Sequence, residues 1–256
     1  MTEAQFYFTS LADCFMDADN ESGTGVLLRD EISESILQLT LNRPETLNAL
    51  NEELLRAIPE AIAEAEEYSV IIFRGAGESF TSGADIHEAQ DEIEGVELFQ
   101  ELTRATRQFD GIVIGAFDGW VVGGGLEWTL SFDLRYASPE TTFKLPESEI
   151  GVPISNASTI LLPLTVGLGR AQELVYTSRE LSATEAKDWG LVNEIFESNR
   201  LDEEVRKVAT DITTNKSERA LLLNRTGIQQ TTPVESALET ESLLGAVAVT
   251  NVDQID

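Results

Sequence analysis

Alternating apolar and polar side chains mark the first clear element of the chain. Leu37, Leu39 and Leu41 alternate with Gln38 and Thr40. A period of two over these positions predicts a half-buried β-strand, with one face in the core and one face in solvent.

A helix is predicted shortly after this strand. Asn51 is placed to cap its first turn, and Glu52 and Glu53 stand where the helix dipole favours negative charge. Apolar side chains then recur at helical spacing, at Leu54, Leu55, Ile58 and Ile62.

Further elements are predicted along the rest of the chain. Short apolar runs indicate strands over residues 70–73, 112–117, 135–137 and 141–145. Ser182 and Glu185 form a capping box for a helix that Gly190 can end. Helical spacing then covers residues 201–214, 217–226 and 234–249. Strands alternating with helices, followed by helices alone, indicate an α/β fold with a helical C-terminal part.

Composition changes this picture mainly through charge. The 256 residues carry 46 Asp and Glu against 17 Lys and Arg, a formal net charge of -29. Such a charge repels nucleic-acid phosphates and anionic lipid, so we expect no nucleic acid and no membrane as a partner. Only four of the basic residues are lysines. This acidic, lysine-poor composition suggests a halophilic protein, and an acidic protein of an ordinary cytoplasm is the alternative.

The N-terminal sequence and the cysteine content bear on the compartment. Cys14 is the only cysteine, which excludes an internal disulfide and fits a reducing compartment. Residues 1–17 show no basic segment followed by an apolar one. No apolar run approaches the ~20 residues that a membrane helix needs. We therefore expect a cytoplasmic protein.

Two segments rich in small residues follow predicted strands. In residues 77–86, the small residues at 82–84 let a ligand approach the backbone closely, although an ordinary turn would look the same. In residues 119–127, the glycines at 123–125 can present free amides at a helix start, where a developing negative charge is stabilised. Tight packing of a strand against a helix is the alternative.

A third segment, residues 143–151, places Pro146 directly before Glu147. The proline restricts the chain beside a carboxylate that acid-base chemistry could use. Most glutamates in so acidic a chain are solvated surface charges, however. The sequence alone does not bring Glu147 near Glu127.

Taken in this order, these segments resemble the crotonase (enoyl-CoA hydratase/isomerase) superfamily. Residues 41–44 (Leu-Asn-Arg-Pro) and 47–50 (Leu-Asn-Ala-Leu) look like its N-terminal signature. Residues 80–86 and 119–127 look like its two oxyanion segments.

The rest of the resemblance lies downstream of the oxyanion segments. Pro146 and Glu147 with Gly151 look like the third active-site segment of the superfamily. The resemblance covers about residues 32–196. The four motifs together are specific for the superfamily, although they are much less specific for one reaction.

The resemblance implies an architecture. Members of the superfamily fold as a spiral of strand-strand-helix turns, with C-terminal helices that help to form homotrimers or dimers of trimers. On this basis we divide the chain into an N-terminal extension of unassigned role (1–31), a crotonase core (32–200) and a C-terminal helical oligomerisation region (201–256).

The resemblance also implies a chemistry, that of a coenzyme A thioester substrate with no metal, nicotinamide or flavin cofactor. By motif match, the backbone amides of Ala84 and Gly124 hold the thioester oxygen as it becomes enolate-like. Glu127 matches the residue that orients and deprotonates water, and Glu147 the one that exchanges a proton at the α carbon. We therefore expect an enoyl-CoA hydratase that adds water across the 2,3 double bond of a 2-enoyl-CoA.

Other residues in or beside the motifs are expected to contact this substrate: Arg43, Leu47, Ala49, Ser82, Gly83, Asp85, Ile86, Gly123 and Ser155. Among them Arg43 is a candidate for the coenzyme A phosphates. A solvated surface arginine is the alternative for that residue.

Other functions stay open on the sequence. Ser155 stands where hydratases of the superfamily usually have a glycine beside the water, which leaves room for a Δ3,Δ2-enoyl-CoA isomerase or another acyl-CoA enzyme. A catalytically inactive acyl-CoA-binding or scaffold protein is a further possibility. His87, the only histidine, has no nucleophile to pair with, so a serine hydrolase is not expected.

Overall fold

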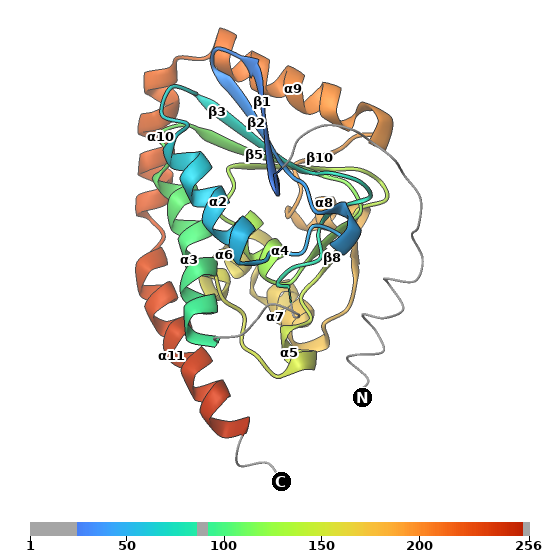
Figure 1. The fold of residues 1–256 in the computed structure, drawn as a ribbon, viewed down its shortest axis with the longest axis vertical. Helices are drawn as coiled ribbons and strands as arrows, with labels where there is room; N and C mark the ends of the chain where they lie inside the picture. Colours follow the sequence, from blue (N-terminus) through green and yellow to red (C-terminus); the bar gives the residue numbers. More distant parts are fainter. Residues whose placement is uncertain (1–24, 86–91, 253–256) are drawn as a thin grey trace.

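The computed structural model describes residues 25–85 and 92–252, and within them the chain forms two sheets surrounded by helices (Figure 1). The larger sheet has the strand order β1-β2-β3-β5-β7-β10, with bounds Leu27–Ser33, Ile36–Leu41, Val70–Gly75, Ile112–Phe117, Leu134–Ala137 and Glu194–Ile195. The smaller sheet has the order β4-β6-β8-β9, with bounds Ser79–Thr81, Trp120–Val122, Thr142–Lys144 and Leu181–Ser182.

The helices fall between the strands and after them. Within the core they are η1 Pro44–Thr46, α2 Glu52–Ala63, α3 Glu92–Gln108, α4 Gly124–Thr129, α5 Glu147–Ile150, α6 Ser158–Val166, α7 Leu168–Thr177 and α8 Ala183–Trp189. The chain then continues into α9 Ser198–Asn215, α10 Glu218–Gln230 and α11 Val234–Val252. No described helix is both long enough and apolar enough to span a bilayer.

The core is a spiral of strand-strand-helix turns. β3, β4 and α3 form one turn, β5, β6 and α4 the next, and β7, β8 and α5 the third. In each turn the first strand joins the larger sheet and the second joins the smaller one, and β3-β5-β7 and β4-β6-β8 pair in parallel. The predicted α/β spiral with a helical C-terminal part is confirmed. The start of the predicted core at residue 32 falls inside β1.

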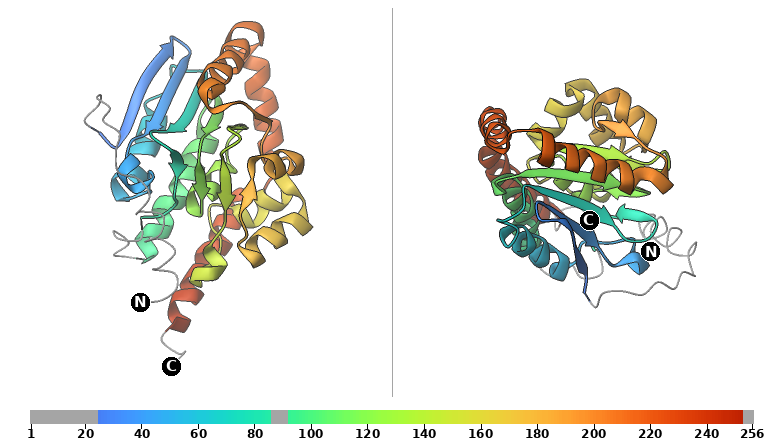
Figure 2. Two further views of the ribbon diagram at one scale, coloured as in Figure 1. Left: turned by 90° about the vertical axis from the view of Figure 1, so that its right-hand side faces the viewer. Right: turned by 90° about the horizontal axis from the view of Figure 1, so that it is seen from above.

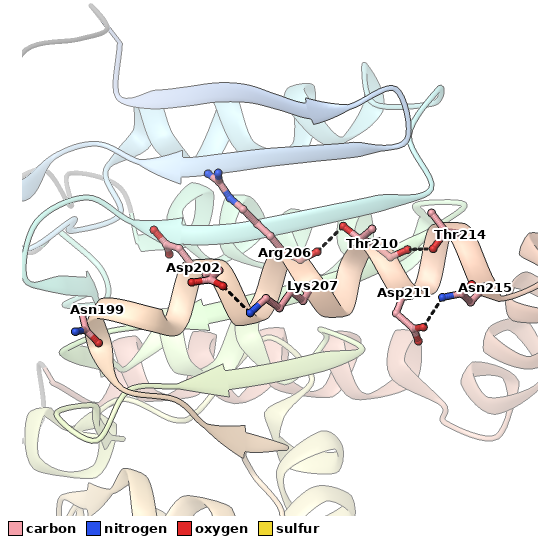
Figure 3. A pocket seen from close by; sticks show the side chains of 9 residues that line it. Asn199, Asp202, Arg206, Lys207, Thr210, Asp211, Thr214 and Asn215 are labelled. Atoms are coloured by element: carbon pink, nitrogen blue, oxygen red, sulfur yellow. Dashed lines mark hydrogen bonds and ion pairs between the residues drawn. The ribbon is translucent and has the colours of Figure 1, made fainter.

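Both faces of the larger sheet are covered. Odd-numbered side chains such as Leu37 and Leu39 join the main core, while even-numbered ones such as Ile36 pack against α9. Figure 2 shows α9 lying across this sheet, and in Figure 3 Arg206 of α9 extends toward β2. Its guanidinium donates to Gln38 Oε1 at 2.9 Å. The prediction that β2 is half exposed is therefore wrong, because α9 buries its polar face as well.

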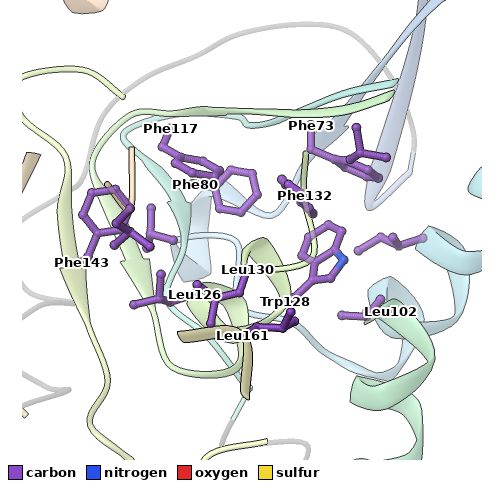
Figure 4. Close-up of a cluster of buried hydrophobic side chains, with 14 of the residues drawn as sticks. Phe73, Phe80, Leu102, Phe117, Leu126, Trp128, Leu130, Phe132, Phe143 and Leu161 are labelled. Atoms are coloured by element: carbon purple, nitrogen blue, oxygen red, sulfur yellow. The ribbon is translucent and has the colours of Figure 1, made fainter. Parts of the chain in front are cut away.

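Aromatic side chains fill the centre of the main core (Figure 4). The Trp128 ring on α4 meets Phe73 and Phe132 edge-on, with both ring-centroid distances at 4.9 Å. Trp128 Nε1 donates to Thr106 Oγ1 at 2.9 Å, which satisfies the buried donor. These contacts anchor α4, the helix that carries Glu127.

Local sequence signals identified several elements correctly. Asn51 caps α2 by accepting from the Leu54 amide at 3.1 Å, and the capping box of Ser182 and Glu185 begins α8, which ends at Gly190. The three predicted C-terminal helices are present as α9, α10 and α11. Of these, α11 packs against α3 and α6, so this C-terminal helix returns to the core (Figure 1).

Candidate active site

The candidate site lies where three adjacent parallel strands end. β4, β6 and β8 pair side by side, with Ser79 opposite Trp120 and Val122 opposite Lys144. Each of the three segments, residues 77–86, 119–127 and 143–151, includes part or all of one of these strands and continues past its carboxyl end. The carboxyl ends of parallel strands meet at one edge of a sheet, so this topology brings the three segments together.

The segment of residues 80–86 runs beside residues 47–50 of the N-terminal signature. The amide of Ser82 donates to the Leu47 carbonyl at 2.9 Å, and the Leu50 amide donates to the Gly83 carbonyl at 2.8 Å. The Asp85 amide returns to the Leu50 carbonyl at 3.1 Å, so Leu50 and Ala84 form a parallel bridge. In such a bridge the amide of Ala84 points away from Leu50. Ala84 is exposed, and its amide has no hydrogen-bond partner among the described residues.

The segment of residues 119–127 contacts the segment of residues 80–86. A methyl group added to Gly83 would lie 2.8 Å from the Val122 carbonyl oxygen and 3.6 Å from Gly123 Cα. Gly83 and Gly123 both have positive φ, 92° and 52°, which side chains other than glycine's rarely permit. Gly124 is the first residue of α4, so its amide is one of the donors that a helix leaves unpaired. The amides of Ala84 and Gly124 thus follow two glycines that touch one another.

Arg43 links the N-terminal signature to the segment of residues 80–86. Its Nη1 donates to the Ala49 carbonyl at 2.6 Å and to Asp85 Oδ2 at 2.9 Å. Both partners are buried, and the Arg43 side chain is only 13 % exposed. The structure therefore gives Arg43 an internal ion pair, while a contact to coenzyme A phosphates stays a prediction.

Glu127 is buried on α4 and is held by Ser155. The Ser155 amide donates to Glu127 Oε1 at 2.9 Å, and Ser155 Oγ donates to Oε2 at 2.7 Å. Burial raises the pKa of Glu127 to about 7, although the two Ser155 hydrogen bonds lower it. A carboxyl group with such a pKa can take up and release a proton near neutral pH.

Glu147, at the start of α5, is also buried. A methyl group added to Gly123 would lie 2.9 Å from Glu147 Oε1, so the side chain rests against the turn that begins α4. Glu147 Oε2 is buried and has no hydrogen-bond partner among the described residues. Burial, and then the charge of Glu127, raise the pKa of Glu147 well above its ordinary value.

The structure thus brings together most of the residues that the sequence singled out. Ser82 Oγ also donates to the Thr46 carbonyl, which fixes this residue against the signature loop. Ile86, one of the nine candidate contacts, and His87 lie outside the described residues.

Sequence reasoning missed three residues around these carboxyl groups. The Phe99 ring of α3 packs against Gly124, where an added methyl group would lie 2.7 Å from Phe99 Cε1. Asn156 Nδ2 approaches Glu127 Oε2 at 3.4 Å. Glu241 of α11 binds the loop that carries Ser155 and Asn156. All three contacts join distant parts of the chain, and no local pattern distinguishes Glu241 among 46 acidic residues.

Comparison with known proteins gives the family. The model of the enoyl-CoA hydratase/isomerase family matches residues 31–243. The chain is 34 % identical to a short-chain-enoyl-CoA hydratase of Clostridium acetobutylicum, over 85 % of this chain and 87 % of that protein. It is 30 % identical to a peroxisomal Delta(3,5)-Delta(2,4)-dienoyl-CoA isomerase of Arabidopsis thaliana, over 73 % and 74 %.

Solved structures show the same relation. The crystal structure of an enoyl-CoA hydratase from Mycobacterium avium subsp. paratuberculosis matches with a TM-score of 0.82 at 26 % identity, over 90 % of this chain and 95 % of that one. Sequence and fold agree over nearly the whole described region. The chain is therefore a member of the enoyl-CoA hydratase/isomerase family, within the crotonase superfamily.

Proposed function

We propose that this chain is an enoyl-CoA hydratase acting on a 2-enoyl-CoA. One observation carries the proposal: Glu127 and Glu147 are both buried, and Glu147 lies against the glycine turn that begins the helix of Glu127, within range of the Glu127 charge. The amides of Ala84 and Gly124, for which the described residues offer no hydrogen-bond partner, stand beside that turn. Two acids and an oxyanion site are what the addition of water to a conjugated thioester needs.

The amides of Ala84 and Gly124 act on the thioester oxygen. As water adds at carbon 3, the electrons of the double bond move toward the carbonyl, and its oxygen gains negative charge. Fixed amide dipoles stabilise that charge without reorganisation, and one such donor is typically worth ~10²–10³-fold in rate. The close contact of Gly83 with Gly123 supports a shared role, because the two amides belong to the residues that directly follow these glycines.

The two glutamates divide the proton transfers. Glu127, ionised, takes a proton from the attacking water, whose oxygen bonds to carbon 3. Glu147, protonated, gives its proton to carbon 2 as the enolate collapses. The reactive form carries one proton on the pair, and the mutual repulsion of the two carboxylates favours that form.

The relatives are consistent with a hydratase, but they include an isomerase as well. Among the similar proteins are a hydratase and a dienoyl-CoA isomerase. One observation favours an isomerase as second candidate: Ser155 Oγ already occupies Glu127 Oε2. A double-bond shift needs no water at that oxygen, and one carboxyl group can then move the proton between two carbons.

The function is tested by incubating the purified protein with crotonyl-CoA in concentrated KCl. Hydration removes the conjugated double bond, so the ultraviolet absorbance of the thioester should fall until equilibrium is reached. A 3-enoyl-CoA tested in parallel reports the isomerase, because absorbance would then rise. Loss of neither substrate at short or long chain length would contradict both functions.

Replacing Ser155 with alanine should shift the pH dependence of the reaction. Its hydroxyl hydrogen bond lowers the pKa of Glu127, so removing it raises this pKa above about 7. Glu127 must be ionised to accept the water proton. The acid limb of the kcat/KM profile should therefore move to higher pH, with a larger loss at pH 6 than at pH 8.

Ser198→Ala is the matched control for this variant. It also removes a hydrogen bond from a serine to a glutamate, the exposed Glu140. Its pH profile should equal that of the wild type. An unchanged profile for Ser155→Ala would show that Ser155 does not set the proton affinity of Glu127.

High salt should stabilise the fold if the acidic surface is an adaptation to it. Raising KCl from ~0.1 M to ~1 M shortens the Debye length from ~10 Å to ~3 Å, which screens the self-repulsion of the net charge of -29. The midpoint of thermal unfolding, followed by circular dichroism, should rise by several degrees. A midpoint that falls or stays constant would contradict the adaptation.

A further inference from the structure

We infer that Glu241 is a positioning residue that orients Glu127 by holding the loop between them. This inference rests on the proposed function, since it assigns a role toward the carboxyl group that accepts the proton. Glu241 is 2 % exposed on α11, far from Glu127 in sequence. Neither the family motifs nor the site residues predicted above include it.

Glu241 takes the place of a missing helix cap. Ala157, the N-cap residue of α6, has a left-handed backbone and no side chain that could accept a hydrogen bond. Glu241 Oε2 accepts from the Ala157 amide at 2.7 Å. Glu241 Oε1 accepts from the Thr159 amide at 2.9 Å and from Thr159 Oγ1 at 2.5 Å. One carboxylate on α11 thereby binds the first turn of α6 with both oxygens.

The segment held by Glu241 leads directly to Glu127. Ser155 and Asn156 immediately precede Ala157, and both contact the Glu127 carboxylate. Asn156 and Ala157 have positive φ, 56° and 60°, a conformation that costs non-glycine residues energy and needs external support. The three hydrogen bonds of Glu241 give that support on the side facing α11.

Helix α11 is itself held in place around Glu241. Gln100 Nε2 of α3 donates to the Leu238 carbonyl at 3.0 Å and to Ser242 Oγ at 2.8 Å, on either side of Glu241. Thr103 of α3 also donates to Asn156 Oδ1 at 3.1 Å. Helix α3 therefore anchors both α11 and the loop, so Glu241 acts from a rigid support.

Glu241 also acts on Glu127 through its charge. The negative charge of Glu241 contributes to raising the pKa of Glu127. Among the elements packed against α11, α6 carries no titratable side chain. Helix α3 contributes three charged groups to a groove that it shares with Glu239 of α11. These groups are Glu97, Glu101 and Arg104. Arg104 pairs with Glu101 and with Glu235.

Three variants test the inference: Glu241→Ala, Glu241→Gln and, as control, Glu239→Gln. Glu239 is exposed on the same helix, so its variant removes the same charge without touching the loop. A displacement of a reacting group by about 1 Å can cost ~10²-fold in rate. Glu241→Ala should therefore lower kcat by roughly 10- to 100-fold with KM nearly unchanged.

Glu241→Gln should behave differently from the alanine variant. The amide oxygen can still accept from Thr159, so kcat should recover in part. The loss of charge should lower the pKa of Glu127, which moves the acid limb of kcat/KM to lower pH. A role in stability alone would move the unfolding midpoint and leave this limb in place. Kinetics and pH limbs of both variants equal to those of Glu239→Gln would overturn the inference.

A second readout does not depend on turnover. The carboxyl carbon of Glu127 can be titrated by nuclear magnetic resonance in uniformly glutamate-labelled protein, with Glu127→Gln identifying its signal. Glu241→Gln should lower the measured pKa of Glu127, and Glu239→Gln should not. If the wild type shows no hydration, the proposed function fails, while this titration still supports or overturns the role of Glu241. It also decides the matter if Glu241→Ala does not fold.

Discussion

Replacing Glu127 with glutamine is expected to lower the kcat for hydration of crotonyl-CoA by ~10²–10⁴-fold, the usual contribution of a general acid or base. Glutamine keeps the shape of the side chain and can still accept from Ser155. It cannot take a proton from water. Steady-state kinetics followed by the loss of thioester absorbance measure the effect.

Glu147→Gln separates a hydratase from an isomerase. In a hydratase both glutamates transfer protons, so Glu147→Gln should lose activity to a similar extent. In an isomerase only one of the two variants should be strongly impaired. Glu149→Gln serves as control, because Glu149 is exposed and pairs with Lys144. Full activity in both glutamine variants would show that neither glutamate transfers a proton in the reaction.

Glu127→Gln should also stabilise the protein at high pH. The pKa of Glu127 in the fold, about 7, lies above its ordinary value of 4.5, so the folded state binds this proton more tightly than the unfolded state. The contribution to stability is present at low pH and is lost as pH rises from 4.5 to about 7. Over that window the wild type should lose about 3 kcal/mol relative to Glu127→Gln. Urea unfolding at constant KCl, at pH 5 and pH 8, measures this difference.

The second large effect should come from Ala84→Pro. Proline removes the amide proposed to bind the thioester oxygen, and the kcat should fall by ~10²–10³-fold. The amide of Ala84 points away from its bridge to Leu50, so proline removes no bond of that bridge. Gly124 is a poorer site for this experiment, because any side chain there would clash with Phe99.

Ala84→Ser is the matched control for the proline variant. It changes an exposed side chain and keeps the amide, so its kcat should stay near that of the wild type. Circular dichroism and the unfolding midpoint check that both variants fold. A proline variant that folds and retains full kcat would remove the amide of Ala84 from the mechanism.

The elements that could be predicted from the sequence are those that carry a local signal, such as an apolar run or a helix cap. The strand at residues 112–117 has the bounds that its apolar run indicates, and the capping box locates α8. The three-residue strands β4 and β6 are too short to show a period. The half-buried pattern of β2 was misleading, because the helix that covers its polar face comes from the C-terminal part of the chain.

Part of the candidate site could be predicted from the sequence, and part depends on how distant helices pack. The glycines and glutamates of the motifs can be identified as site residues from the sequence, because their chemistry depends on residue type and on the local backbone. Ser155 was singled out as a departure from the superfamily, and the structure shows that it binds both oxygens of Glu127. The contributions of Phe99 and Glu241 depend on how α3 and α11 pack, which no spacing along the chain encodes.

The central claim is that Glu127 and Glu147 add solvent water to a thioester held by two amides. It is tested most directly by incubating the protein with crotonyl-CoA in water enriched in the heavy oxygen isotope and analysing the thioester by mass spectrometry. The product should be a 3-hydroxy thioester that carries the solvent oxygen at carbon 3. Recovery of crotonyl-CoA alone, with no 3-hydroxy thioester formed by folded protein at high KCl, would contradict this mechanism.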